Sequence, residues 1–324
     1  MSLLTPTHVS ELETEVEVAK ISHPATDIVE VTLRRADGGQ LPRWTPGAHI
    51  DVLLGDGDDA LVRQYSLCSS PADLTEYRIA VLKEPNSRGG SERIHQLSEG
   101  ERLTIRGPRN NFPFVTAPRY VFIAGGIGIT PIMTMVEEAE AAGAQWELHY
   151  GGRTHGSMAF ADELAERGDQ VNLVPQDEKG MLDLAGILGT PATGTLVYCC
   201  GPEPLLDAVE QACKPWPHGA LHVERFAAKE IDAGENAAFE VVLQRSGKTL
   251  DVPADKSVFD VMRENGVSVL GSCLEGVCGT CETGVLEGEV DHRDSVLDDD
   301  EQAANDCMMV CVSRCRGDRL VLDA

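Results

Sequence analysis

Four cysteines in the last quarter of the chain have the residue type and the spacing to hold iron. Cys273, Cys278 and Cys281 form the pattern C-x4-C-x2-C, and Cys311 follows after 29 further residues. Four thiolates at this spacing are the ligands of a plant-type [2Fe–2S] cluster, which carries single electrons. Glycines such as Gly276 lie inside the loop, and their access to positive φ lets a short segment wrap around such a cluster. We therefore expect these four cysteines to be metal ligands.

Disulfide bonds and a zinc site are the alternative uses of these cysteines. Disulfides need an oxidising compartment, and the N-terminal region has neither the basic nor the apolar segment of a signal peptide. Structural zinc sites usually contain two C-x2-C pairs, whereas here only Cys278 and Cys281 form one. Cys307 and Cys315 each lie four residues from Cys311, but only Cys311 has the expected ligand spacing. The composition thus favours the cluster in a reducing cytoplasm.

The overall composition limits the classes of partner. The chain has 324 residues, enough for two or three domains, and a formal net charge of −26. No segment approaches the roughly 20 apolar residues of a membrane span. Binding of nucleic acid needs Lys and Arg to neutralise phosphate, so a chain this acidic disfavours it. The acidity suits a protein partner with a basic patch, or serves only to keep the protein in solution. Without a visible heptad repeat, a monomer is expected.

Residues 1–114 are expected to form an antiparallel β-barrel that binds a flavin. Short alternating segments run from Glu15 to about residue 106, separated by turns rich in Gly and Asp, a pattern typical of a barrel or sandwich. One segment ends in the pattern R-x-Y-S at positions 63–66. Arg63 can make a charge-assisted hydrogen bond to phosphate. Tyr65 can pack on the flavin ring system, and the hydroxyl of Ser66 can lie near flavin N5. Alone, the tetrapeptide is also compatible with an ordinary barrel strand.

A second segment strengthens the prediction of a flavin phosphate site. Gly89, Gly90 and Ser91 open a helix predicted over residues 91–97. The first N–H groups of a helix, together with its dipole, attract anions. We expect Arg63 and this turn to hold the same phosphate from two sides, although a plain helix N-cap is the alternative.

Residues 115–228 are expected to form an α/β domain with a doubly wound parallel sheet. The apolar run at 120–124 is typical of a strand buried on both faces, and the glycine-rich segment 125–131, with Gly126 and Gly128, leads into a helix. A second strand-to-helix turn contains Cys200, Gly201 and Pro202. Such turns at the carboxyl ends of parallel strands form a nucleotide-binding crevice. The glycines depart from G-x-G-x-x-G, so a simple tight turn stays possible.

The last domain is expected at residues 239–324, after a polar linker at 229–238. A hairpin, a helix capped by Ser257 and the cysteine loop follow one another there. Ser is a preferred N-cap residue. This order of elements predicts the small α+β (β-grasp) fold of a ferredoxin.

Taken together, these motifs carry a family resemblance over about residues 16–322. A barrel with R-x-Y-S, a nucleotide domain with G-G-I-G-I-T-P and C-G-P, and a ferredoxin module resemble the ferredoxin–NADP reductase superfamily. The order of the three modules resembles the phthalate dioxygenase reductase family, whose members use FMN and mostly prefer NADH. The resemblance implies further cofactor-binding residues: Val81 and Lys83 on the next flavin strand, Phe226 stacking on the isoalloxazine, and Gly126, Thr130, Cys200 and Gly201 at the nicotinamide cleft.

The resemblance also bears on nucleotide preference. Arg153 is a candidate contact to adenosine or phosphate, with a plain surface charge as the alternative. Asp177 and Glu178 would repel a 2′-phosphate if they lie near the ribose, which favours NADH.

The function implied is that of an NADH-dependent reductase that passes electrons through FMN and the [2Fe–2S] cluster to a terminal oxygenase of the Rieske type. Ser66 and Cys200 are the catalytic candidates, because they would order the flavin and nicotinamide rings for hydride transfer. A reductase for a cytochrome P450 and a general flavin or quinone reductase are the alternatives. A redox carrier or sensor without turnover is a third, but the sequence has no basic DNA-binding helix.

Overall fold

The computed structural model describes residues 12–55, 61–85, 87, 89–229 and 236–324, and these fall into two compact units. The first unit comprises Met1–Asp183, Ala192–Tyr198 and Pro217–Ala220, and the second comprises Leu184–Pro191, Cys199–Trp216 and Leu221–Ala324. The predicted division into three domains stays a prediction. Residues 230–235 of the predicted linker and 56–58 of a predicted turn lie outside the described residues.

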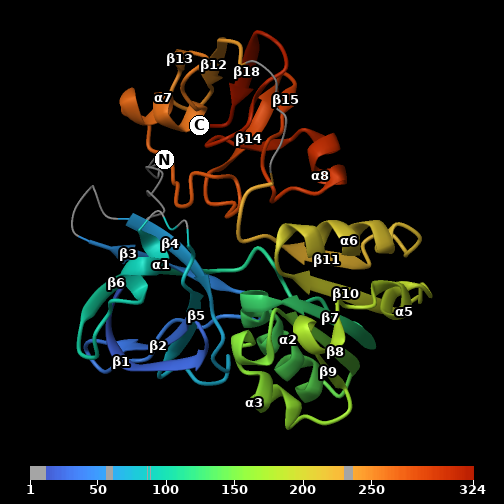
Figure 1. Cartoon of the computed structure of the whole chain (residues 1–324). Coiled ribbons are helices and arrows are strands. Elements are labelled where there is room, and N and C mark those ends of the chain that lie inside the picture. Colours follow the sequence, from blue (N-terminus) through green and yellow to red (C-terminus); the bar gives the residue numbers. More distant parts are fainter. Residues whose placement is uncertain (1–11, 56–60, 86, 88, 230–235) are drawn as a thin grey trace, which may run out of the picture. The chain divides into compact units, whose positions relative to one another are not determined.

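Six strands near the N-terminus form one antiparallel sheet, as the alternating pattern predicted (Figure 1). The strands are β1 (Glu13–Ala25), β2 (Ile28–Arg35), β3 (His49–Leu54), β4 (Leu61–Ser66), β5 (Tyr77–Leu82) and β6 (Arg102–Arg109). Their order in the sheet is β4-β3-β6-β1-β2-β5. An antiparallel bridge between Leu67 and Ile79 joins the two ends of this order, so the sheet closes into a barrel.

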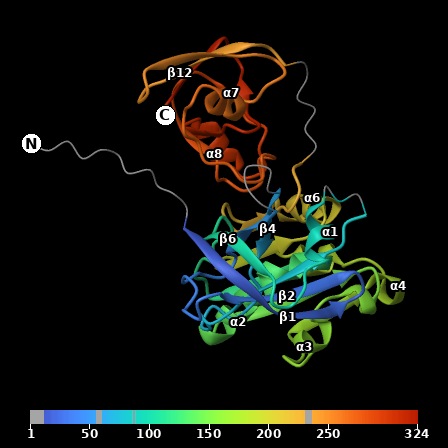
Figure 2. The same ribbon diagram turned by 90° about the vertical axis from the view of Figure 1, so that its left-hand side faces the viewer.

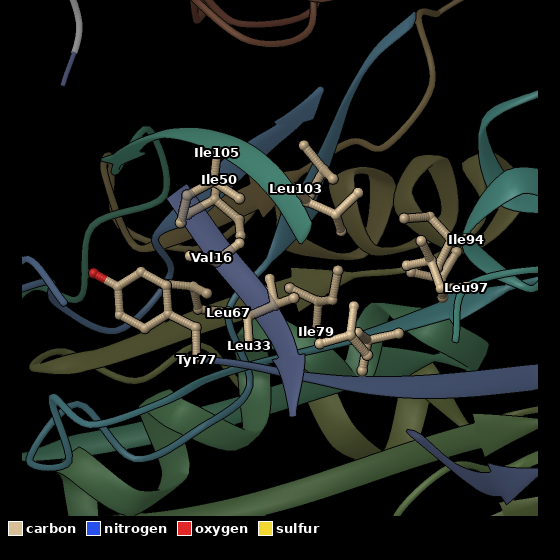
Figure 3. Close-up of a cluster of buried hydrophobic side chains, with 14 of the residues drawn as sticks. Val16, Leu33, Ile50, Leu67, Tyr77, Ile79, Ile94, Leu97, Leu103 and Ile105 are labelled. Atoms are coloured by element: carbon tan, nitrogen blue, oxygen red, sulfur yellow. The ribbon is translucent and has the colours of Figure 1, made fainter. Parts of the chain in front are cut away.

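The inside of the barrel is a continuous apolar core (Figure 3). Alternate residues of the strands point inward because successive side chains of a strand lie on opposite faces. Val16, Leu33 and Ile50 are completely buried there, and Ile94 from the short helix α1 (Gly90–Ile94) joins them. Burial of such a side chain contributes about 1.5–3 kcal/mol. This core fixes the strands that carry the flavin motif.

The next elements alternate strand and helix, as predicted for the nucleotide domain (Figure 1). The strands are β7 (Arg119–Gly125), β8 (Gln145–Gly152), β9 (Val171–Pro175), β10 (Thr195–Cys200) and β11 (Leu221–Glu224). The helical segments are η2 (Gly126–Gly128), α2 (Ile129–Ala141), η3 (His155–Ser157), α3 (Ala161–Ala165), α4 (Gln176–Lys179), α5 (Leu184–Leu188) and α6 (Glu203–Cys213). The sheet order is β11-β10-β7-β8-β9, and β7 pairs in parallel with β8, as β8 does with β9. The order therefore reverses beside β7, the switch point where ligands bind in such sheets.

The C-terminal part forms the predicted α+β fold around a five-stranded sheet of order β13-β12-β18-β14-β16. Its strands are β12 (Phe239–Leu243), β13 (Lys248–Val252), β14 (Glu282–Glu287), β16 (Cys307–Met309) and β18 (Arg319–Leu322), and β15 (Val290–Asp291) and β17 (Arg314–Cys315) form a separate pair. The helices are α7 (Val258–Glu264), beside β12 and β13 (Figures 1 and 2), and α8 (Asp299–Ala304). The hydroxyl of Ser257 accepts the N–H of Asp260 at 3.0 Å, which confirms the predicted helix cap.

Within the part of the chain that the structure describes, no helix is long and apolar enough to cross a membrane.

Candidate functional site

The structure gathers the four predicted cysteine ligands at one place. The Cys273 side chain interacts with those of Cys278 and Cys311, and the Cys281 side chain interacts with that of Cys311. The exposed fractions of Cys278 and Cys281 are only 2% and 3%. The neighbouring Cys278 side chain is the largest of the effects that lower the pKa of Cys273. These four soft sulfur donors, close together and largely shielded from water, fit a cluster that binds through thiolates.

The interactions among the four cysteines are pairwise. Among the described residues, no group of three or more His, Cys, Asp or Glu side chains has the arrangement to hold one metal ion. A [2Fe–2S] cluster takes two thiolates on each iron, so its ligands need to meet in pairs only. The contacts of Cys273 with Cys278 and of Cys281 with Cys311 provide such pairs.

The two flanking cysteines have other surroundings. Cys307 lies on β16, where burial raises the pKa of its thiol to about 11. Cys315 lies on β17, and its sulfur accepts the N–H of Gly317 at 3.2 Å. These placements favour Cys311 as the fourth ligand.

The backbone of the cysteine loop takes the positive φ angles that its glycines predicted. Gly276 and Gly279 have φ values of 72° and 69°. Leu274, directly after the first ligand, also has a positive φ of 56°, which is uncommon for a non-glycine residue. The loop N–H of Glu275 donates to the Cys273 sulfur at 3.3 Å. Such N–H donors stabilise a thiolate and tune the potential of a bound cluster.

The flavin motif lies on β4 as predicted. In the register with β3, Arg63 faces Val52, Tyr65 faces Ile50 and Ser66 faces His49. Tyr65 packs against the barrel core, and burial raises the pKa of its phenol. The exposed fraction of Ser66 is 6%.

The structure brings Arg63 and the Gly89–Ser91 turn together, as the sequence predicted. A Cβ atom added to Gly90 would lie 2.5 Å from Cγ and 2.7 Å from Nε of Arg63. The arginine side chain therefore lies directly on the backbone of this turn. Gly89 has a φ of 89° and is the N-cap of α1.

The helix at this turn differs from the prediction in extent. It covers Gly90–Ile94 and ends before the predicted residue 97. The hydroxyl of Ser91 accepts the N–H of Glu84 at 3.1 Å, so it fastens the preceding loop and does not cap the helix. Residues 86 and 88 of that loop lie outside the described part of the chain.

Of the two residues implied on the next flavin strand, Val81 lies on β5 and Lys83 directly after it. The side chain of Val81 belongs to the barrel core, and its carbonyl oxygen lies 3.0 Å from Nε2 of His95. Val81 can therefore face a ligand with its backbone only. Lys83 follows the strand, is exposed, and donates its N–H to the Asp27 carbonyl at 2.8 Å. Strand β5 also lies beside η2, so the flavin strand adjoins the glycine-rich nucleotide loop.

The glycine-rich loop connects β7 to α2. Gly126 has a φ of 54°, and Gly128 directly precedes the helix. The exposed fraction of Thr130 is 2%, and its hydroxyl donates to the Ile127 carbonyl at 3.0 Å. Thr130 thus holds the shape of the loop.

Cys200 ends β10, and Pro202 is the N-cap of α6, with Gly201 between them. Cys200 is completely buried, and its thiol donates to Oε2 of Glu224 at 3.9 Å. Burial, followed by the charge of Glu224, raises the pKa of this thiol well above its usual value. Cys200 is therefore a neutral thiol that can order a neighbouring ring but cannot act as a thiolate. Sequence reasoning missed Glu224, since no motif marks it.

The remaining two predicted residues lie after strands. Arg153 follows β8, is exposed, and its carbonyl accepts the N–H of Asp177 at 3.2 Å. Phe226 follows β11 with an exposed fraction of 44%. The neighbouring Arg225, which the sequence did not single out, forms ion pairs with Glu210 at 2.5 Å and Glu203 at 3.3 Å. These pairs fasten the segment that carries Phe226 to α6.

Comparison with known proteins agrees with this site. Residues 241–316 match the model of the 2Fe-2S iron-sulfur cluster binding domain, and residues 122–211 match that of the oxidoreductase NAD-binding domain. The carnitine monooxygenase reductase subunit of Escherichia coli (strain K12) is 43% identical over 316 residues, which is 95% of this chain and 98% of that protein.

Two solved structures extend the comparison over the whole chain. Phthalate dioxygenase reductase, described as a modular structure for electron transfer from pyridine nucleotides to [2Fe–2S], is 36% identical with a TM-score of 0.70, covering 99% of this chain and all of that one. An intact type IV self-sufficient cytochrome P450 monooxygenase is 44% identical with a TM-score of 0.89, and this chain spans 43% of its length.

The fold and the site thus define an iron–sulfur flavoprotein oxidoreductase of the ferredoxin–NADP reductase superfamily. Within that class, the chain belongs to the phthalate dioxygenase reductase family of electron-transfer reductases. The predicted family, fold class, enzyme class, [2Fe–2S] cluster and pyridine-nucleotide dependence are confirmed.

Proposed function

We propose that this protein is the reductase component of an oxygenase system and passes electrons from NADH through FMN and a [2Fe–2S] cluster to a terminal oxygenase of the Rieske type. The observation that carries the proposal is the meeting of four cysteine thiols in a chain whose full length matches oxygenase reductases. When bound, a flavin would supply hydride acceptance from the nucleotide, and a [2Fe–2S] cluster would supply single-electron transfer.

The flavin would be held by the barrel. Arg63, lying on the backbone of Gly90, supplies a fixed positive charge for the terminal phosphate of FMN, and the short helix behind the turn adds N–H donors. Tyr65 offers its ring as a packing surface. Ser66 offers a hydroxyl whose position the barrel core fixes, which suits a donor to the flavin ring.

The nucleotide would be held at the carboxyl ends of the parallel strands. Gly126, Gly128 and Thr130 shape the loop for the pyrophosphate. Cys200, kept protonated, and Phe226 would order the nicotinamide and flavin rings. Because β8 and β9 pair up to Gly152 and Pro175, Arg153 and the acidic Asp177 emerge side by side. A carboxylate there suits the 2′-hydroxyl of NADH and disfavours a 2′-phosphate.

Charge and ligand chemistry bear on the partner protein and on the cellular location. The chain's net charge of −26 supports steering towards an oxygenase surface with a basic patch. Thiolate ligands need a reducing compartment, which supports a cytoplasmic location. We take the monomer as the working form.

A cytochrome P450 is the second candidate acceptor. The specific observation in its favour is the 44% identity to a segment of a self-sufficient P450 monooxygenase, which exceeds the 36% to phthalate dioxygenase reductase. Reduction of an added P450 and of an added Rieske oxygenase by the NADH-reduced protein would compare the two directly.

The proposal is tested by following the visible spectrum during anaerobic titration with NADH and then with NADPH, after which the flavin is extracted with acid. We expect NADH to bleach both the flavin and the cluster bands and FMN to be released. Bleaching of the flavin alone would mean that the cysteine loop holds no cluster, and the proposed electron path would then be wrong.

A further inference from the structure

A carboxylate is buried directly behind the cysteine loop. Asp294 lies between β15 and α8, and its side chain is completely buried. Its Oδ1 accepts the N–H groups of Val296 at 3.1 Å and Leu297 at 2.8 Å. Its Oδ2 accepts the hydroxyl of Ser313 at 3.4 Å. All of these contacts use the aspartate as an acceptor, as an ionised carboxylate requires.

Asp294 joins the two separate segments that supply the cluster ligands. On one side, a Cβ atom added to Gly276, inside the cysteine loop, would lie 3.1 Å from the Cα of Asp294. The next residue, Ser295, donates its N–H to the Gly276 carbonyl at 2.8 Å. On the other side, Ser313 lies two residues after Cys311, and its hydroxyl also accepts the N–H of Arg293 at 3.1 Å. The carboxylate thus holds Ser313, near the fourth ligand, while the backbone N–H of the neighbouring Ser295 holds the loop that carries the first three.

The charged groups around Asp294 do not pair with it by a hydrogen bond. The exposed fraction of the His292 ring is 5%, and its Nδ1 lies 3.7 Å from Oδ2 of Asp294, beyond hydrogen-bond length. Neither ring nitrogen of His292 has a hydrogen-bond partner among the described residues. The side chain of Arg293 forms an ion pair with Asp291, with 2.6 Å between Nη2 and Oδ2. Asp294→Asn therefore removes one negative charge without breaking a hydrogen bond to any of these charged groups.

We infer that Asp294 is a positioning residue for the [2Fe–2S] cluster and sets its reduction potential. The inference rests on the proposed function in that Cys273, Cys278, Cys281 and Cys311 hold the cluster. The oxygens of Asp294 bond to Ser313 and fix the turn at residues 294–297, and the N–H of Ser295 in that turn bonds to Gly276, so the two ligand segments are held together. The negative charge of Asp294, in a region of low dielectric, opposes the arrival of a further electron on the cluster.

Two substitutions distinguish the effect of the Asp294 charge on the reduction potential from the effect of its oxygens on the ligand segments. Asp294→Asn keeps an oxygen for the N–H groups of Val296 and Leu297 but removes the charge. We expect this variant to bind a full complement of iron and sulfide and to have a higher midpoint potential. The equilibrium constant for cluster reduction should rise at least about tenfold, equivalent to about 59 mV for one electron.

Asp294→Ala removes the oxygens as well as the charge. We expect its cluster to be lost at least about fivefold faster under air, because two buried N–H groups lose their acceptor. Asp251→Asn is the matched control: Asp251 is exposed on β13, at the edge of the sheet farthest from the cysteine loop strand β14, and should change neither property.

Cluster content is measured by iron and sulfide analysis of the full chain, and the potential by titration with dithionite and redox dyes, without NADH. An unchanged potential in Asp294→Asn would overturn the inferred charge effect. Full cluster retention in Asp294→Ala would overturn the positioning role. Because neither measurement uses the nucleotide, a failure of the proposed NADH-to-oxygenase function would show separately, in the NADH titration.

Discussion

The contact between Gly90 and Arg63 gives the sharpest prediction for the flavin site. In Gly90→Ala, the new Cβ would lie 2.5 Å from Cγ of Arg63, about 1 Å closer than an ordinary contact allows. The backbone itself accepts alanine, since Gly90 is helical and alanine favours a helix. Arg63 must therefore move away from the turn while the fold is retained.

The size of the effect follows from the interaction that Arg63 would lose. A hydrogen bond to a charged group contributes about 1.5–3 kcal/mol. Loss of this bond to the FMN phosphate should weaken FMN binding about 10- to 100-fold. Riboflavin lacks the phosphate, so its binding should be the same in the variant and the parent protein.

The assay is titration of flavin-free protein with FMN and with riboflavin, followed by flavin fluorescence. Gly156→Ala is the matched control, since its Cβ would meet nothing closer than 3.9 Å. Affinity for FMN within twofold of the parent would refute the assignment of Arg63 to the phosphate. Equal weakening for riboflavin would instead show that the substitution damages the ring pocket.

Three further predictions concern the other parts of the molecule. Ser66→Ala should slow the reduction of the flavin by NADH about tenfold or more, while FMN binding changes little; stopped-flow rates equal to those of the parent would remove Ser66 from the catalytic role. Cys311→Ser should abolish the cluster yet retain NADH-to-ferricyanide activity through the flavin, and survival of the cluster spectrum would point to Cys307 or Cys315 as the ligand. Burial lowers the pKa of His149 below its usual value, against the opposing effect of Glu147. Because the unfolded chain then binds the proton more readily, stability should be full above about pH 6.5 and fall as the pH drops below it; His149→Gln should flatten this dependence of the melting temperature, and an unaltered slope would contradict the assignment.

Local sequence patterns determined the cluster ligands, many of the strands and one helix cap. The spacing of the four cysteines predicted the cluster because that spacing is typical of the ligand loop of plant-type [2Fe–2S] proteins. The alternation of the first segments predicted the barrel strands, and the apolar run at 120–124 predicted the buried strand β7, because side-chain periodicity reflects burial directly. The cap at Ser257 needed only the three residues that follow it.

Other features were decided only by the tertiary structure. Nothing near Asp294 in the sequence indicates that it meets both Gly276 and Ser313, and nothing near Glu224 indicates its contact with Cys200. The shortened helix α1 and the use of Ser91 to hold Glu84 also escaped prediction. These contacts join residues 7 to 24 positions apart, and no local pattern encodes them. They exist because packing of the strands and loops fixes which buried polar groups can reach a partner.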